Sequence, residues 1–171
     1  MMPGRKLLQI KTFRIMPTTS ITQQMPCSSA EVFEVLHDYS RRLEWDTLLS
    51  SAALTQGHVK AGPGATSLCV GKGWLGRIGI GTIYVTWQEG TLAAVRMINE
   101  PPFFASFAAS IRHQDNADGS TATYRLTFRA KPVWLRWVME PVILWVLRLE
   151  TQKRLRALAA FLRASRESAT A

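Results

Sequence analysis

Tyr124 is the polar side chain best placed to work inside an apolar pocket. It alternates with Leu126 and Phe128 along residues 120–129, where the intervening positions are threonines and arginines. Alternation of this kind is typical of a half-buried strand, so these three side chains share the buried face. A buried tyrosine needs a hydrogen-bond partner, which is here either a ligand oxygen or a backbone group.

Arg96 and Glu140 are the charged candidates for the same pocket. The strand phase of Arg96 is ambiguous, but an inward guanidinium without a partner is costly and would mark a site. Glu140 could pair with Arg96, or it could pair on a helix surface with Arg136, four residues away. The apolar side chains that we expect around the pocket, with plain core packing as the alternative, are Trp45, Phe107, Leu126, Phe128 and Trp137.

The residues that usually hold metals or form nucleophilic sites have no suitable spacing. His37, His58 and His113 lack the H-x-x-x-H separation of metal ligands, and we expect His113 at the surface beside a turn. Cys27 and Cys69 fit neither a metal nor a redox motif, and we expect both to be reduced. There is no G-x-S-x-G motif. We therefore expect no metal and no cofactor.

Residues 71–76 match the pattern G-x-G-x-x-G. A dinucleotide site requires a helix directly after this pattern, because the helix N-terminus holds the pyrophosphate. The residues that follow favour a strand, so we interpret the motif as a hairpin loop and exclude nucleotide binding. Trp74 and Leu75 would lie at its tip, against a membrane or at the mouth of the cavity, unless Trp74 folds back on the core.

Composition narrows the class of protein and its partners. The chain has 171 residues, of which 47% are hydrophobic and 19% charged, and this fits one globular domain with a sizeable core. The net charge of +9 favours anionic partners, although a solvated basic helix face also explains it. Basic residues are not interleaved with strand aromatics, so we expect no nucleic acid. We expect a cytoplasmic protein, with peripheral attachment to an anionic membrane as the alternative.

Residues 133–164 form one long predicted helix around which the other elements must be arranged. Its second half carries an apolar stripe at three- and four-residue steps: Leu144, Leu147, Thr151, Leu155, Leu158 and Leu162. The basic residues, Arg154 among them, lie largely off this stripe. The first half is apolar nearly all round, which predicts burial on more than one side or contact with a ligand, a partner or a membrane. Interrupting charges and Pro141 make a transmembrane span the weaker interpretation.

The rest of the chain shows a short helical segment followed by strands and turns. Ser28 and Glu31 form an S-x-x-E capping box before one short helix, and a second short helix is predicted at 41–48. Strands are predicted at 18–25, 53–56, 66–70, 78–87, 91–98, 103–113 and 120–129. This order predicts an α+β fold in which a bent antiparallel sheet grips the long helix. The sheet would bury the apolar first half of the helix and leave an enclosed space beside it.

Several local motifs resemble the START-like, or SRPBCC, superfamily, in particular its polyketide cyclase/dehydrase and lipid-transport branch. The residues that carry the resemblance are 26–33, 37–46 and 118–121. The resemblance implies a helix-grip fold, with two short helices after the first strand and a curved antiparallel sheet of about six or seven strands wrapped around the long C-terminal helix. We accordingly expect a START-like domain at 18–165, a basic, loosely held extension at 1–17 and a C-terminal tail at 166–171.

The resemblance also implies a deep, mostly apolar cavity that holds lipids, sterols, polyketides, plant hormones or quinones. We expect a carrier or binding module for a hydrophobic small molecule. One alternative is a polyketide cyclase or aromatase, which ionisable groups converging inside the cavity would favour. The other is a homodimeric interaction module, which would have a filled cavity and a self-complementary apolar patch.

Overall fold

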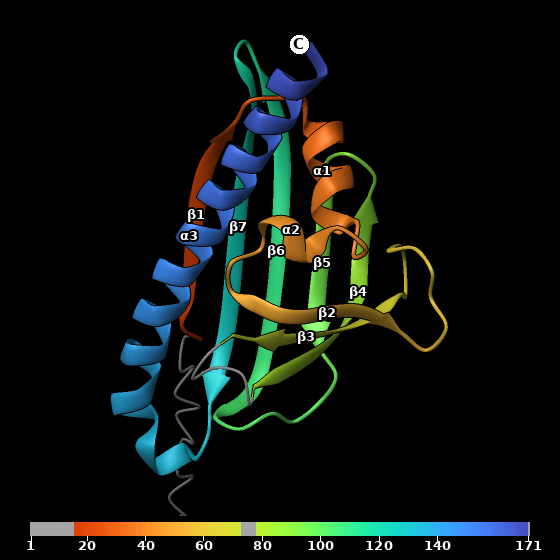
Figure 1. The fold of residues 1–171 in the computed structure, drawn as a ribbon. Helices are drawn as coiled ribbons and strands as arrows, with labels where there is room; N and C mark the ends of the chain where they lie inside the picture. The colour runs from red at the N-terminus through yellow and green to blue at the C-terminus, as the bar shows by residue number, and fades with distance from the viewer. Residues whose placement is uncertain (1–15, 73–77, 171) are drawn as a thin grey trace, which may run out of the picture.

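The computed structural model describes residues 16–72 and 78–170, and there the chain forms a seven-stranded antiparallel sheet with helices on one face (Figure 1). The strands are β1 (Thr18–Met25), β2 (Leu49–Thr55), β3 (Thr66–Gly71), β4 (Gly79–Gln88), β5 (Leu92–Met97), β6 (Phe104–Asn116) and β7 (Gly119–Ala130). The helices are α1 (Ser29–His37), α2 (Arg42–Trp45), a 3-10 turn at Val133–Leu135 and α3 (Arg136–Thr170). This is the predicted helix-grip α+β fold.

The sheet has the strand order β1-β7-β6-β5-β4-β3-β2, so the first strand lies beside the last. Its longest hairpin, β6–β7, is paired from Phe104 and Ala130 to Asn116 and Gly119. The turn of this hairpin runs against the end of β1: a Cβ atom on Gly119 would lie 2.4 Å from the Met25 carbonyl oxygen. Glycine is therefore required there, both for this contact and for a φ of +136°.

The two short helices lie in the connection from β1 to β2 (Figure 1). The Ser28 hydroxyl accepts a hydrogen bond from the Glu31 backbone N–H at 3.4 Å, so one half of the predicted capping box forms. Asp115, near the end of β6, accepts from both the backbone N–H and the hydroxyl of Ser29, which fixes α1 to the sheet. The second helix is shorter than the predicted 41–48, because the backbone turns to an extended conformation at Asp46.

The long helix confirms the predicted stripe. Thr151, Leu155, Leu158 and Leu162 are buried between α3 and the rest of the core, which includes Phe33. Figure 1 shows α3 running beside β1 along the edge of the sheet. Its second half thus joins the main core, as the spacing of apolar residues predicts.

The first half of α3 corrects one expectation, since the sheet does not bury it on all sides. Ile143, Leu144 and Leu147 pack against Leu126 and Phe128. The opposite side of the helix is exposed, together with the 3-10 turn that precedes it: Trp134, Trp137, Val138, Val142, Trp145 and Leu149. A single sheet reaches one side of a helix, and no other element of the described ranges covers its outer side.

Some expectations fall on residues outside those ranges. They concern most of the N-terminal extension (1–17) as well as Trp74 and Leu75.

The G-x-G-x-x-G segment is followed by β4 rather than by a helix, in agreement with the exclusion of a nucleotide site. Cys27 and Cys69 are both free thiols. No helix within residues 16–72 and 78–170 is long and apolar enough to cross a bilayer.

Candidate functional site

A cavity of about 640 Å³ lies between the sheet and α3. Such a volume falls within the range of small-molecule sites. Its apolar wall is built by Ile78, Ile80, Val95, Phe104, Phe107 and Leu126 from the sheet side and by Met139, Ile143, Val146 and Leu147 from α3. The strands alternate their side chains, so those of one phase in β4 to β7 point to this side of the sheet.

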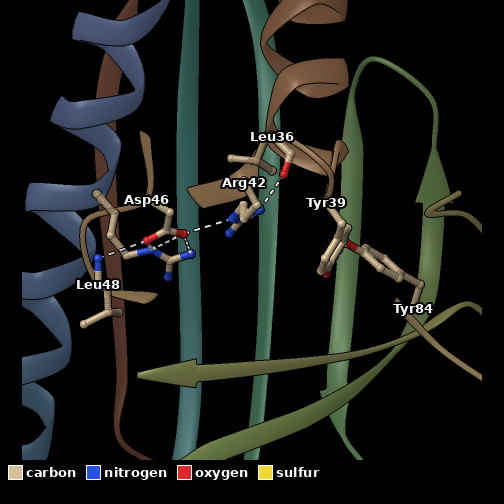
Figure 2. Close-up of polar contacts among 7 residues, drawn as sticks. Leu36, Tyr39, Arg42, Asp46, Leu48 and Tyr84 are labelled. Carbon is tan, nitrogen blue, oxygen red and sulfur yellow. Dashed lines mark hydrogen bonds and ion pairs between the residues drawn. The ribbon is translucent and has the colours of Figure 1, made fainter. Parts of the chain in front are cut away.

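One part of the cavity wall is polar. Arg42 and Arg154 both line it, and both bind the buried carboxylate of Asp46. Arg154 Nη2 lies 2.8 Å from Asp46 Oδ2, and Arg42 Nε lies 2.9 Å from the same oxygen. Asp46 Oδ1 accepts from Arg154 Nε and from the Leu48 backbone N–H, while Arg42 Nη1 donates to the Leu36 carbonyl oxygen. Figure 2 shows Asp46 next to Arg42 below α1.

The charges of this cluster stabilise one another. Burial alone would raise the pKa of Asp46, but the guanidinium groups of Arg154 and Arg42 outweigh it and hold that pKa below its usual value. Burial alone would lower the pKa of Arg154, and the Asp46 carboxylate outweighs it in turn. Asp46 is therefore ionised and fully paired, which makes it a poor proton acceptor at neutral pH.

Tyr39 and Tyr84 form a second polar group beside this cluster (Figure 2). Their hydroxyl oxygens lie 3.1 Å apart, both residues line the cavity, and burial raises the pKa of each. His37 also lines the cavity and pairs through Nδ1 with the Phe33 carbonyl oxygen. Burial lowers the pKa of His37 to about 3. Both tyrosines and His37 are therefore neutral at pH 7.

Three of the predicted site residues line the cavity: Phe107, Tyr124 and Leu126. Two others lie on the same side of the sheet without lining it. Phe128 is fully buried in the cluster around Phe104, and Trp45 is buried in the main core, where the Arg42 guanidinium lies over its ring. Phe128 has the inward phase that the alternation of β7 predicts, but neither residue lines the cavity.

Arg96, Trp137 and Glu140 lie elsewhere than expected. Arg96 is exposed, because the alternation of β5 directs its neighbour Val95 inward. Trp137 is 79% exposed on the outer side of α3. Glu140 binds the Ala130 backbone N–H, and Arg136 binds the Ala130 carbonyl oxygen, so neither the Arg96 pair nor the helix-surface pair forms. Trp74 and Leu75 lie outside the described residues.

The polar group of the cavity is not among the predicted site residues, although the spacing of its members is visible in the sequence. Arg154 falls three residues after Thr151 and four before Leu158, so it lies at the border of the buried stripe rather than off it. Arg42 precedes Asp46 by one helical turn, and Tyr84 shares a strand phase with Ile80. What the pattern could not reveal is the contact between Asp46 and Arg154, which are 108 residues apart.

The mouth of the cavity borders the exposed apolar side of α3. Val142 and Phe103 line the cavity and are also 57% and 50% exposed. Val142 lies between Val138 and Trp145 on the outer side of the helix, so the cavity wall and the exposed side meet there. Over residues 16–72 and 78–170, no three His, Cys, Asp or Glu side chains gather closely enough to hold a metal ion.

The family model described as polyketide cyclase/dehydrase and lipid transport matches residues 16–163. No curated protein matches the sequence.

Several solved structures share the fold at low sequence identity. The Zhui aromatase/cyclase from Streptomyces sp. R1128 is 12% identical, with a TM-score of 0.71 over 87% of this chain and 94% of that one. A START superfamily protein from Mycobacterium smegmatis is 10% identical, with a TM-score of 0.68 over 86% and 97% of the two chains. The di-domain aromatase/cyclase StfQ of the steffimycin pathway is 12% identical, with a TM-score of 0.73 over 88% of this chain. This chain covers 51% of StfQ, about half its length.

Proposed function

Because the chain belongs to the polyketide cyclase/dehydrase and lipid transport family, we propose that it binds a hydrophobic small molecule between its sheet and α3, as a carrier or binding module. The observation that supports this most directly is the cavity itself, which has a largely apolar wall and about 640 Å³ of space. Apolar surface of this kind gains free energy when a ligand removes it from water.

A cavity-filling variant tests this proposal. Val95 lines the cavity from β5, so Val95→Phe places a larger apolar side chain in the space a ligand would take. Titration with the neutral fluorophore N-phenyl-1-naphthylamine should show saturable binding to the wild type and at least about tenfold weaker binding to the variant. Val85→Phe, on the exposed side of the neighbouring strand β4, is the matched control and should bind as the wild type does. Absence of saturable binding to the wild type would contradict the proposal.

A cyclase is the second candidate, because ionisable groups do converge on the cavity: Arg42, Arg154, His37, Tyr39 and Tyr84. The guanidinium groups could hold carbonyl oxygens of a polyketide-like chain while its ring closes. Proton abstraction, however, is most efficient when the base has a pKa near the working pH. The pKa of His37 is lowered to about 3 and Asp46 is fully paired, so we favour binding over catalysis.

Ring closure can be measured directly. Incubation with a linear poly-β-ketone thioester, followed by liquid chromatography and mass spectrometry, would give more cyclised product than the uncatalysed reaction if the protein is a cyclase. Arg42→Gln would then remove most of that excess. A product distribution identical to that without protein would exclude this candidate for the substrate used.

We also propose that the exposed side of α3 docks on an anionic membrane, so that a ligand can pass between the bilayer and the cavity mouth. Trp134, Trp137 and Trp145 are 64% to 79% exposed, and tryptophan side chains favour the membrane interface. Arg148 lies on the same stretch of helix, and the chain carries a net charge of +9, which complements anionic headgroups.

A further inference from the structure

The polar part of the cavity carries more positive than negative charge. Arg42 and Arg154 share the single carboxylate of Asp46. The acidic residue in the cavity wall, Glu150, is bound to Lys153 at 2.7 Å and so has a cation of its own. The other titratable side chains that face this space are His37, Tyr39, Tyr84, Cys69 and Tyr124. Burial shifts the pKa of the first four toward the neutral form, so those four are uncharged at neutral pH.

Both guanidinium groups also retain unused hydrogen-bond donors. Nε and Nη1 of Arg42 and Nε and Nη2 of Arg154 are the nitrogens that bind protein oxygens. Among residues 16–72 and 78–170, Nη2 of Arg42 and Nη1 of Arg154 have no hydrogen-bond partner. The two side chains are 10% and 16% exposed and both line the cavity, so an entering ligand can reach these donors.

We propose that the ligand is an amphiphile with a carboxylate head, which Arg42 and Arg154 bind, and an apolar tail that lies along the wall formed by the sheet and α3. This inference rests on the proposed function above and adds the chemical class of the ligand. A carboxylate offers two oxygens to guanidinium donors and forms the stronger, charge-assisted kind of hydrogen bond. It also balances a cationic excess that apolar surroundings screen poorly.

The pair of Tyr39 and Tyr84 also favours a ligand whose polar end accepts hydrogen bonds. One hydroxyl hydrogen of Tyr39 or Tyr84 is used between the two oxygens, and the other can be donated to another acceptor. The polar part of the cavity is therefore rich in donors, whereas the lining that Met139, Ile143, Val146 and Leu147 of α3 contribute is apolar. A ligand with one anionic end and an apolar tail matches both parts at once.

The inference is tested with three ligands of equal chain length: tetradecanoic acid, tetradecan-1-ol and methyl tetradecanoate. Each displaces bound N-phenyl-1-naphthylamine at pH 7.5, and the concentrations for half displacement are compared. The acid should act at a concentration at least about tenfold lower than the alcohol or the ester, the factor expected of one charge-assisted hydrogen bond. Equal displacement by all three would overturn the inference and leave the apolar cavity intact. Failure of the probe and all three ligands to bind would overturn the proposed function as well.

Two variants, one that removes a positive charge and one that removes a negative charge, then test which residues bind the carboxylate. Arg42→Gln leaves Asp46 paired with Arg154 and should reduce the preference for the acid over the alcohol to about threefold or less. Glu150→Gln removes a negative charge at the cavity and should increase the preference. Arg156→Gln, an equal change of charge on the exposed side of α3, is the control and should leave it unchanged. An acid preference that Arg42→Gln and Glu150→Gln both leave at the wild-type value would contradict the assigned site.

Discussion

His113 is a buried residue whose burial was not expected from its place near a turn. It is 3% exposed on β6, its ring stacks edge-on against Phe33, and neither ring nitrogen has a hydrogen-bond partner. Burial lowers its pKa from 6.5 to about 4, so the ring is neutral in the folded protein. His37, whose ring lies 4.2 Å from that of Phe33, is held neutral in the same way.

We predict that these histidines make the fold sensitive to acid. Their pKa values are lower in the folded than in the unfolded state, so their contribution is complete above about pH 6.5 and is lost as the pH falls toward the folded values of about 4 and 3. For His113 the loss approaches about 3 kcal/mol near pH 4. Urea denaturation at pH 7, 6 and 5 measures this effect. Between pH 7 and pH 5, the unfolding free energy of His113→Leu should fall by less than that of the wild type.

His58→Leu is the matched control, because His58 is exposed in a turn and its replacement should leave the pH dependence unchanged. At pH 7, His113→Leu should be as stable as the wild type or more so, since it removes two unsatisfied polar atoms. An unchanged loss of stability on acidification in His113→Leu would contradict the account.

The side of the sheet to which a residue points was predictable where apolar and polar residues alternate regularly along the strand. Tyr124 and Leu126 line the cavity as the pattern of β7 predicts. The same reasoning failed for Arg96, because the hydrophobic residues around it allow either phase and only the pairing with β6 decides. The contact of Asp46 with Arg154 depends on the tertiary fold and has no local signal.

At the scale of elements, Asp46 is the link between the helices. It follows α2, and it binds Arg42 within that helix and Arg154 in the middle of α3. The carboxylate thereby connects the short helices to the long one beside the cavity. A buried network of this kind is costly to break, because loss of one member leaves charges without partners.

Asp46→Ala should destabilise the protein by about 3–5 kcal/mol, since two largely buried guanidinium groups lose their anion. Chemical denaturation at pH 7 measures this free energy. Glu44→Ala serves as control: its pair with Arg41 is about half exposed and screened by solvent, so its removal should cost much less. Equal effects of the two variants would show that the buried cluster does not connect the helices.

The exposed side of α3 predicts binding to lipid vesicles. Wild-type protein should sediment with vesicles of phosphatidylcholine and phosphatidylglycerol and less with phosphatidylcholine alone, because the chain is basic. The double variant Trp134→Gln, Trp137→Gln should bind about tenfold more weakly, as interfacial apolar contacts are lost.

Leu43→Gln, an exposed apolar residue on α2, is the control and should bind vesicles as the wild type does. Equal sedimentation of the double variant and the wild type would contradict membrane docking. If size-exclusion chromatography shows a wild-type dimer that the tryptophan variant abolishes, a second copy of the chain covers this side instead.

The order and type of the elements were predictable, because seven strand signals, two short helical segments and one long helix each stand out in the sequence. The exposure of half of α3 was not. An apolar helix with no polar side predicts apolar contacts all round, but it does not tell which sides the folded chain leaves exposed. The physical difference is one of tertiary placement, since α3 lies along the edge of the sheet beside β1 (Figure 1).

At the scale of the whole molecule, the cavity and the exposed side of α3 lie next to each other. A sheet closed on one side by α3 leaves a mostly apolar cavity with a cationic part, and the mouth of this cavity opens beside the tryptophan-rich side of the same helix. An empty apolar cavity contributes no packing energy, so a bound ligand would also stabilise the fold. We expect the proposed carrier function to depend on the cavity, its cationic part and its mouth.

Native mass spectrometry of the protein purified from its own host tests the central claim most directly. The account predicts a population heavier than the chain alone by the mass of a small molecule, which organic extraction removes and which contains an acidic group and an apolar chain. The bare mass of the chain, together with no thermal stabilisation by a panel of fatty acids, quinones and polyketides, would contradict it.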